Sequence, residues 1–308
     1  MHFLKLDWNP STGINLIGDF KLHYYSVMWI VAFILGWYIM KRIFTREKVS
    51  LEYLDPLFIY TVLATMIGAR LGHVLFYQSE LIKEDFFSIF LPFSFKNGIE
   101  FTGFQGLASH GAAIGIIIGM YLYRRKYTYK SLIWILDRIV IPVSIGAVFI
   151  RIGNFINSEI IGKVTESGFG VRFIQDQYSK YQIVKNTGIN NVNEAYAAVT
   201  ENPKFQYLLD VVPYRHPAQL YEAFCYIFVF IILWFTYTKT KKGEQSGYLF
   251  GLFLVMLWTV RLVIEFFKEP QGDEYINWLN LNTGQWLSIP FLLIGFYFMF
   301  LFKPRNTK

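Results

Sequence analysis

Charged residues are scarce in this chain, and cysteine is nearly absent from it. Only 17% of its 308 residues are Asp, Glu, Lys or Arg, whereas 54% are hydrophobic and 19% are aromatic. A soluble domain of this size needs a more polar surface, so the composition excludes one and indicates an integral membrane protein. The one cysteine, Cys225, lies inside an apolar run, where a lone thiol is most often an inert small side chain and not a nucleophile.

Three further features are missing from the sequence. Its start has no basic stretch followed by a short apolar core, so we expect no cleavable signal peptide. It contains no internal repeat and no low-complexity tract, whereas inverted repeats mark many secondary transporters. It also has no cluster of carboxylates that would hold Mg²⁺, so it predicts no metal site.

Long apolar runs make up most of the chain. At roughly 1.5 Å per residue, seven of them are long enough to cross a hydrocarbon core of about 30 Å. They cover residues 24–42, 55–77, 104–123, 131–153, 217–238, 247–267 and 285–302. The stretch FFSIFLPFSF, which follows Asp85, is too short to span and is predicted to lie in the membrane interface. The sequence therefore predicts an all-α polytopic membrane protein with seven transmembrane helices.

Lys and Arg are distributed unevenly between the two sets of connections. Fourteen of them lie in residues 41–48, 124–130, 239–242 and 303–308, and five lie in the short segments on the other side. By the positive-inside rule the first set is cytoplasmic, which places the N-terminus outside and the C-terminus in the cytoplasm. Loops that face an anionic leaflet then account for the formal net charge of +7, so this charge does not indicate nucleic-acid binding.

One connection, from residue 160 to residue 216, is too long for an ordinary loop. The charge count places it outside, and its composition predicts a small folded head with short strands and one short helix. The predicted organisation is one membrane domain with an inserted head. Residues 1–159 hold transmembrane helices one to four, residues 160–216 the extracytoplasmic head, and residues 217–308 helices five to seven.

Polar residues gather at the outer ends of the predicted helices. The stretch RIGNFINSEI puts Arg151, two asparagines and Glu159 directly after an apolar run, where each must find a partner or stay in contact with water. The other members of this level are Tyr24, Tyr25, Arg70, His73, His110, His216, Gln219, Glu222, Arg261 and Glu265. A transporter distributes polar groups through the midplane, so this one-sided cluster indicates a pocket. Its three arginines favour an anionic lipid headgroup, because guanidinium binds phosphate oxygens bidentately.

Helical spacing predicts how the arginines are held. Asn154 and Asn157 are three residues apart, and Arg261 and Glu265 are four apart, so each pair shares one helix face. We expect these residues to fix the arginine side chains. His110 is predicted to lie six residues into its span, about 9 Å deep on the outer side.

The same stretches carry a resemblance to a known family. RIGNFINSE resembles the signature of bacterial prolipoprotein diacylglyceryl transferases, G-R-x-G-N-F-x-N-x-E. Further motifs of that family are matched, in the same order, by HYYSVM, ARLGHVLFY, SHGAAIG, RHPAQLYEA, RLVIEFFKEP and GQWLSIP. The ordered set runs from Tyr25 to Pro290 and so covers nearly the whole membrane part.

The chain departs from the family pattern at four positions. These are Ile150 and Ser26 in place of frequent glycines, Ala112 in place of the second glycine of a histidine-glycine-glycine motif, and Lys268 in place of a frequent arginine. The first three make the backbone packing around His110 and Arg151 bulkier and leave the headgroup ligands in place. The head at 160–216 shows little that matches.

The resemblance implies an enzyme, a transferase that takes part in lipoprotein biosynthesis. Such an enzyme moves the diacylglyceryl group of phosphatidylglycerol to the lipobox cysteine thiol of a prolipoprotein signal peptide, leaving a thioether and glycerol phosphate. The implied partners are these two substrates and the membrane, and the implied location is the bacterial cytoplasmic (inner) membrane. No cofactor is implied.

The resemblance and the chemistry together suggest roles for the polar residues. A thiol must lose its proton to become a nucleophile, and His110 is the candidate base. Arg151 and Arg261 would stabilise the charge that builds on the departing phosphate, and Tyr25 joins this catalytic set through the resemblance. The candidate substrate-binding residues are Arg70, Asn154, Asn157, Glu159, Gln219 and Glu265.

Each of these roles has a plainer alternative. In the alternative interpretation, Arg151 anchors a helix at the interface, Arg261 forms a structural ion pair, and His110 makes an interhelical hydrogen bond. Arg70 fits a role in helix packing as well as it fits a headgroup ligand, and Tyr25 also fits the belt of aromatic residues at the membrane interface. For the whole protein, the alternatives are a lipid-binding or lipid-translocating protein without chemistry, and another headgroup transferase.

Overall fold

The structure is a computed structural model that describes residues 4–17, 20–91, 93–94, 98, 100–101, 106, 108–269, 275–276 and 281–303. The chain forms two compact units. Unit 1 consists of Met1–Gly36 and Val140–Lys308, and unit 2 consists of Trp37–Ile139.

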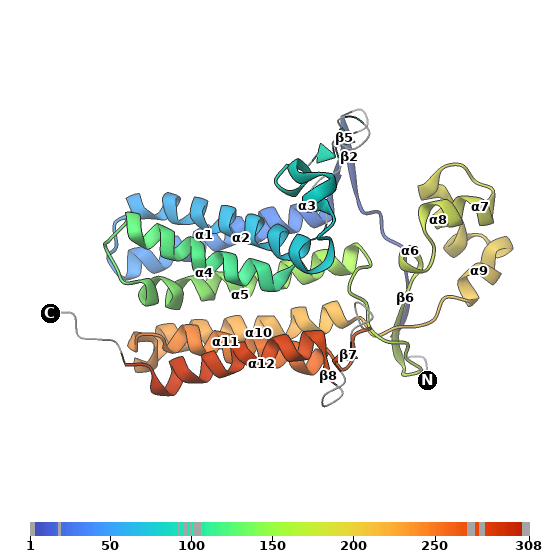
Figure 1. Ribbon diagram of the computed structural model, residues 1–308. Coiled ribbons are helices and arrows are strands. Elements are labelled where there is room, and N and C mark those ends of the chain that lie inside the picture. The colour runs from blue at the N-terminus through green and yellow to red at the C-terminus, as the bar shows by residue number, and fades with distance from the viewer. Residues whose placement is uncertain are drawn as a thin grey trace. The chain divides into compact units, whose positions relative to one another are not determined.

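Long helices lie where the sequence predicts them (Figure 1). They are α1 (Tyr24–Arg46), α2 (Leu54–Tyr77), α4 (Ser109–Lys126), α5 (Leu132–Ile156), α10 (Ala218–Lys239), α11 (Tyr248–Ile264) and α12 (Thr283–Phe296), the last continued by the π-helical turn η5 (Tyr297–Leu301). Among the described residues, five helical runs are long and apolar enough to cross a membrane, and they include α1, α2, α5, α10 and α12 with η5. This confirms a mostly helical membrane protein. α4 ends in three basic residues and α11 has only 17 residues, so neither is among the five.

The third predicted span begins later than its apolar run suggests. The sequence predicts a start at residue 104, but α4 begins at Ser109, so His110 lies in its first turn. Residues 102–105 and 107 lie outside the described part of the chain. Gly106 has a φ of 73°, a left-handed value that an α-helix does not allow, so the helix cannot extend back through it.

The helices α2 and α4 of unit 2 lie side by side (Figure 1), and glycines line their contact. A Cβ added to Gly111 would lie 2.3 Å from the carbonyl oxygen of Gly68, and one added to Gly72 would lie 2.6 Å from the Cα of Gly111. A Cβ on Gly115 would lie 2.4 Å from the carbonyl oxygen of Ala64. The two backbones therefore touch, an approach that small residues permit in membrane helices.

This close approach predicts a loss of stability in Gly111→Ala. The new methyl group forces α2 and α4 apart, which should cost about 1–3 kcal/mol and lower the thermal unfolding temperature of the purified protein. Gly36→Ala is the matched control, because its new Cβ would lie an ordinary 3.7 Å from the side chain of Pro142. Equal unfolding temperatures for the two variants would show that α2 and α4 are not packed this tightly.

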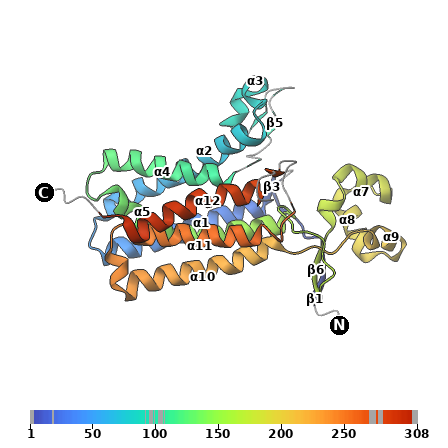
Figure 2. The same cartoon turned by 60° about the horizontal axis from the view of Figure 1, so that its bottom comes forward.

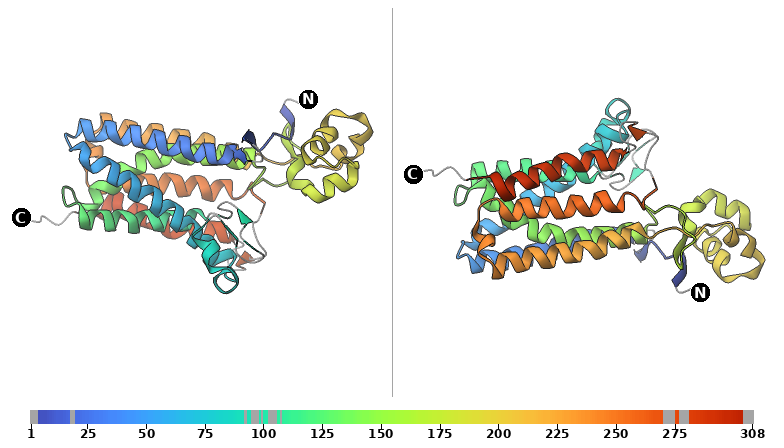
Figure 3. Two further views of the ribbon diagram at one scale, coloured as in Figure 1. Left: turned by 90° about the horizontal axis from the view of Figure 1, so that it is seen from above. Right: turned by 90° about the horizontal axis from the view of Figure 1, so that it is seen from below.

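In unit 1, α11 lies between α10 and α12 (Figure 3). The short strands are β1 (Leu4–Trp8), β2 (Gly13–Ile17), β3 (Phe20–His23), β6 (Phe169–Phe173), β7 (Tyr275–Ile276) and β8 (Leu281–Asn282), with β4 (Phe93–Ser94) and β5 (Glu100–Phe101) in unit 2. β1 pairs in parallel with β6, and the indole of Trp8 donates a hydrogen bond to the carbonyl oxygen of Phe155 at 2.9 Å. These contacts fix the end of α5, where the RIGNFINSE motif lies.

The segment between α5 and α10 is more helical than its composition predicts (Figure 2). The prediction of one short helix was wrong, because the segment holds α6 (Ile174–Gln177), α7 (Lys180–Thr187), α8 (Val192–Glu201) and α9 (Gln206–Asp210). Local sequence signals account for two of them. Ser179 and Gln182 form a capping box that starts α7, and the side chain of Asn191 caps α8. Residues between 174 and 212 form a hydrophobic core, with Ile174, Ile183 and Ala195 fully buried.

The apolar stretch after Asp85 forms the short helix η2 (Phe86–Ile89), preceded by α3 (Leu81–Glu84), and does not span. Phe86, Phe87 and Phe90 are exposed, whereas Ser88 and Ile89 are buried. One face of this stretch therefore packs on unit 2 and the other presents aromatic side chains. Its location in the membrane interface stays a prediction.

Candidate functional site

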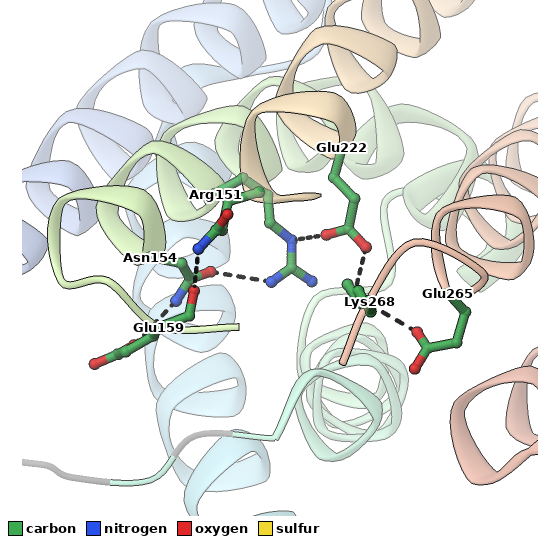
Figure 4. Close-up of polar contacts among 7 residues, drawn as sticks. Arg151, Asn154, Glu159, Glu222, Glu265 and Lys268 are labelled. Atoms are coloured by element: carbon green, nitrogen blue, oxygen red, sulfur yellow. Dashed lines mark hydrogen bonds and ion pairs between the residues drawn. The ribbon is translucent and has the colours of Figure 1, made fainter. Parts of the chain in front are cut away.

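Arg151 lies in the last two turns of α5 and is only 8% exposed. Its Nη1 donates a hydrogen bond to Oδ1 of Asn154 at 3.0 Å, as helical spacing predicts for residues three apart. Its Nε forms an ion pair with Glu222 of α10 (Figure 4). The hydroxyl of Tyr226, one turn further along α10, also interacts with Arg151. The guanidinium group is therefore held from two helices in one orientation.

Glu159 continues this network from the turn that follows α5. Its two carboxylate oxygens accept hydrogen bonds from the amides of Asn154, at 3.3 Å, and Asn157, at 3.1 Å. Its carbonyl oxygen accepts a bond of 2.5 Å from the fully buried Gln219. The structure thus brings together five residues that the sequence predicts for the site, Arg151, Asn154, Asn157, Glu159 and Gln219.

The backbone around Glu159 is strained. Ser158 and Ile160 have φ values of 56° and 57°, in the left-handed region that non-glycine residues seldom adopt. Such residues cost about 1–3 kcal/mol each and tend to cluster at functional sites. Burial raises the pKa of Glu159 above its ordinary range, and the hydrogen bonds from Asn157 and Asn154 oppose that rise. The turn therefore holds a carboxyl group at a place that disfavours its charge.

A second group of charges extends the site beyond the sequence prediction. Glu222 is fully buried, and one of its carboxylate oxygens lies 2.7 Å from Nζ of Lys268, just after α11. Nζ of Lys268 also lies 3.6 Å from the carboxylate of Glu265 (Figure 4). The sequence places Glu222 at the level of the pocket without assigning it a role, and Lys268 stands out there only as a departure from the family pattern. The sequence did carry a signal for the role of Glu222. It is a carboxylate one turn after Gln219 in an apolar helix, and a charged group in such a place requires cationic partners.

Arg261 does not make the contact that its spacing predicts. The expected ion pair between Arg261 and Glu265 is absent from the described residues, because the carboxylate of Glu265 turns to Lys268 instead. The guanidinium carbon of Arg261 lies 5.4 Å from the ring centre of Trp258. Its Nε is buried, and no described residue accepts a hydrogen bond from it. This donor is therefore available to an anionic ligand.

Tyr25 is the second residue of α1 and packs on the signature motif. A Cβ on Gly153 would lie 2.6 Å from the ring of Tyr25, so glycine at this position lets the ring lie directly against α5. Tyr25 also lies within electrostatic reach of Arg151, Asn154 and Glu159. Its predicted place in the site is therefore compatible with the structure.

The remaining predicted residues belong to unit 2. Nη2 of Arg70, which is 8% exposed, donates a hydrogen bond to the carbonyl oxygen of Ser88 at 3.1 Å. His110 precedes Gly111, which packs directly on α2, and the Nε2 of His110 is buried. His73 packs closely on Gly106, where a Cβ would lie 2.2 Å from its Nε2. The glycine contacts between α2 and α4 thus set the positions of Arg70, His73 and His110 within this unit.

The chemistry of this arrangement suits a phosphate ester. Buried guanidinium groups bind phosphate oxygens and stabilise charge that develops on them, and a site already organised by ion pairs does so without reorganisation. The comparison with protein families then decides the class of the protein. The model of the family described as prolipoprotein diacylglyceryl transferase matches residues 12–301. This chain belongs to that family.

Individual members of the prolipoprotein diacylglyceryl transferase family are similar to the chain over nearly its full length. A phosphatidylglycerol–prolipoprotein diacylglyceryl transferase of Bacteroides fragilis is 37% identical over 308 residues, which cover 99% of this chain and 98% of the relative. The transferase of the same name from Tolumonas auensis is 34% identical over 303 residues, or 98% of this chain and all of the relative. The one from Porphyromonas gingivalis is 34% identical over 299 residues, or 96% and 93%. The family match includes every residue placed in the site above.

Proposed function

We infer that this chain transfers the diacylglyceryl group of phosphatidylglycerol to the lipobox cysteine of a prolipoprotein, the first step of lipoprotein maturation. One structural observation supports this activity best. Arg151 is held by Glu222 and Asn154, while a buried donor of Arg261 has no protein acceptor among the described residues. Arginines held in this way suit a lipid phosphate, and the family membership supplies the reaction.

The proposed reaction assigns roles to the site residues. His110 takes the proton of the substrate thiol, and the resulting thiolate attacks the glycerol carbon that joins the diacyl moiety to the phosphate. A carbon–sulfur bond forms as the carbon–oxygen bond breaks, and glycerol phosphate departs with the electron pair. Arg151 and Arg261 stabilise its charge, and Tyr25 lies against the motif that positions Arg151. Arg70, Asn154, Asn157, Glu159, Gln219 and Glu265 bind and orient the lipid.

The reaction is tested by incubating the purified protein with phosphatidylglycerol and a lipobox peptide. The expected product is a peptide heavier by one diacylglyceryl group, linked as a thioether. A matched peptide with serine in place of the lipobox cysteine should remain unmodified. Tight binding of phosphatidylglycerol with no modified peptide would contradict the proposal and indicate a lipid-binding or lipid-translocating protein.

For the membrane arrangement, we propose seven spans in the bacterial cytoplasmic (inner) membrane. Besides the five long apolar runs, α4 and α11 have 18 and 17 residues, which correspond to about 25–27 Å of helix. The basic connections are then cytoplasmic, the N-terminus is outside, and residues 160–216 form an extracytoplasmic head between residues 1–159 and 217–308.

Cysteine labelling checks this topology. In a Cys225→Ala background, Asn186→Cys in α7 should react with an impermeant thiol reagent added to intact cells, and Lys241→Cys should not. Both positions are exposed in the structure, so accessibility of the side chain itself does not distinguish them. The reverse labelling pattern would place the site in the inner leaflet and contradict the proposed orientation.

A further inference from the structure

Glu222 is the most deeply buried charge of the site, and the proposed reaction does not use it. It is fully buried and forms ion pairs with Arg151 and with Lys268. Removing a carboxylate from water is energetically costly, and well-packed apolar residues would avoid that cost. Its two cationic partners lie outside its own helix, Arg151 in α5 and Lys268 just after α11, so neither pair is a contact within one helix. The cost points to a function in which its charge is needed.

Arg151, Lys268, Glu222 and Glu265 pair with one another and balance in charge, and Arg261, which forms no ion pair among the described residues, adds a positive excess. Arg151, Arg261 and Lys268 are cations, and Glu222 and Glu265 are the carboxylates that pair with two of them. Glu159 is separated from Arg151 by Asn154. Three positive and two negative charges leave a net +1. This excess matches a phosphodiester, which carries a single negative charge.

The product of the proposed reaction is charged differently from the substrate. Glycerol phosphate is a monoester, and a phosphate monoester carries about −1.5 to −2 at neutral pH. A site with the full charge of three cations would hold this dianion tightly after each turnover. A carboxylate behind the arginine weakens that hold, because its charge acts on the ligand through a poorly screened, buried position.

We propose that Glu222 is the positioning residue of the lipid phosphate site, where it orients Arg151 through Nε and sets the local charge so that a monoanionic phosphodiester binds and the dianionic product leaves. Lys268 is its counterpart, since the ammonium group holds the second carboxylate oxygen and keeps Glu222 aligned with Arg151. Glu222 does not touch the phosphate itself. The inference rests on the proposed transferase function and adds a determinant of product release.

Inhibition by glycerol phosphate tests this role. In Glu222→Gln the side chain keeps its size and loses its charge, so the inhibition constant of glycerol phosphate should fall by about tenfold or more. The turnover number should fall as well, because Arg151 loses its orientation. Lys268→Met removes a cation and should raise the inhibition constant, while Lys268→Arg keeps the charge and should leave it within about twofold of the wild type.

A purely structural ion pair predicts a different pattern. Glu222→Gln and Lys268→Met would both lower stability and leave the inhibition constant of the folded fraction unchanged, which would overturn the proposal. If Glu222→Gln yields no folded protein, the test rests on Lys268→Met, for which the proposal predicts a higher inhibition constant of glycerol phosphate. An unchanged or lower inhibition constant in Lys268→Met would overturn the proposal. Direct calorimetric titration of the same variants with glycerol phosphate gives the charge effect independently of catalysis. Binding of glycerol phosphate therefore tests the role of the Glu222 charge, and thioether formation by the wild type tests the proposed function separately.

Discussion

Arg151→Lys and Arg261→Lys should each slow diacylglyceryl transfer by about 100-fold or more, the order observed when one preorganised stabiliser of an oxyanion is lost. Lysine keeps the positive charge and removes the planar set of donors. At Arg151 the substitution eliminates Nε and Nη1, which bind Glu222 and Asn154, so the cation loses its fixed orientation. At Arg261 it eliminates the buried Nε that faces no protein acceptor among the described residues.

The measurement is the turnover number for a lipobox peptide at saturating phosphatidylglycerol. Arg125→Lys, at the exposed end of α4, is the matched control and should retain wild-type turnover. Near-normal transfer in Arg151→Lys and Arg261→Lys would show that these residues only anchor their helices, and the phosphate would then have to be bound elsewhere.

His110→Asn should lower transfer by about 100-fold near neutral pH, and the deficit should shrink as the pH rises. Asparagine keeps a hydrogen-bonding group of similar reach but cannot take the thiol proton. An unperturbed cysteine thiol ionises near pH 8.5, so at high pH the substrate supplies its own thiolate and needs the base less. The ratio of wild-type to variant rates should therefore decline between about pH 6 and pH 10.

The folded fraction of both proteins has to be measured at each pH, because His110 lies beside the tightly packed Gly111. A structural histidine predicts a constant ratio, with either full activity or lower stability in the variant. A flat ratio would remove His110 from the role of base and would assign thiolate formation to the positive potential of the arginines.

Local sequence patterns predict the parts of the site that lie on one helix or one turn. The contact between Arg151 and Asn154 follows from their spacing, and the position of both at the end of α5 follows from the apolar run before them. The long helices are predictable for the same reason, since their length and apolarity reflect the bilayer they must cross. The motifs that carry the family resemblance are also local.

Contacts between helices were not predictable in the same way. The spacing of Arg261 and Glu265 permits an ion pair, but Lys268 offers Glu265 a closer cation once α11 has ended. The pairing of Arg151 with Glu222 joins residues 71 positions apart along the chain, and no periodicity reports on it. The start of α4 was misplaced because an apolar run does not reveal the left-handed backbone at Gly106.

The central claim is that the lipid phosphate leaves with its glycerol when the substrate thiol attacks. It is tested most directly by counting glycerol phosphate and modified peptide in one reaction that contains phosphatidylglycerol with a labelled headgroup. The account predicts one glycerol phosphate for each thioether formed, and none when the lipobox cysteine is replaced by serine. Two results would contradict this mechanism. One is release of glycerol phosphate with the serine peptide, and the other is formation of modified peptide without release of glycerol phosphate.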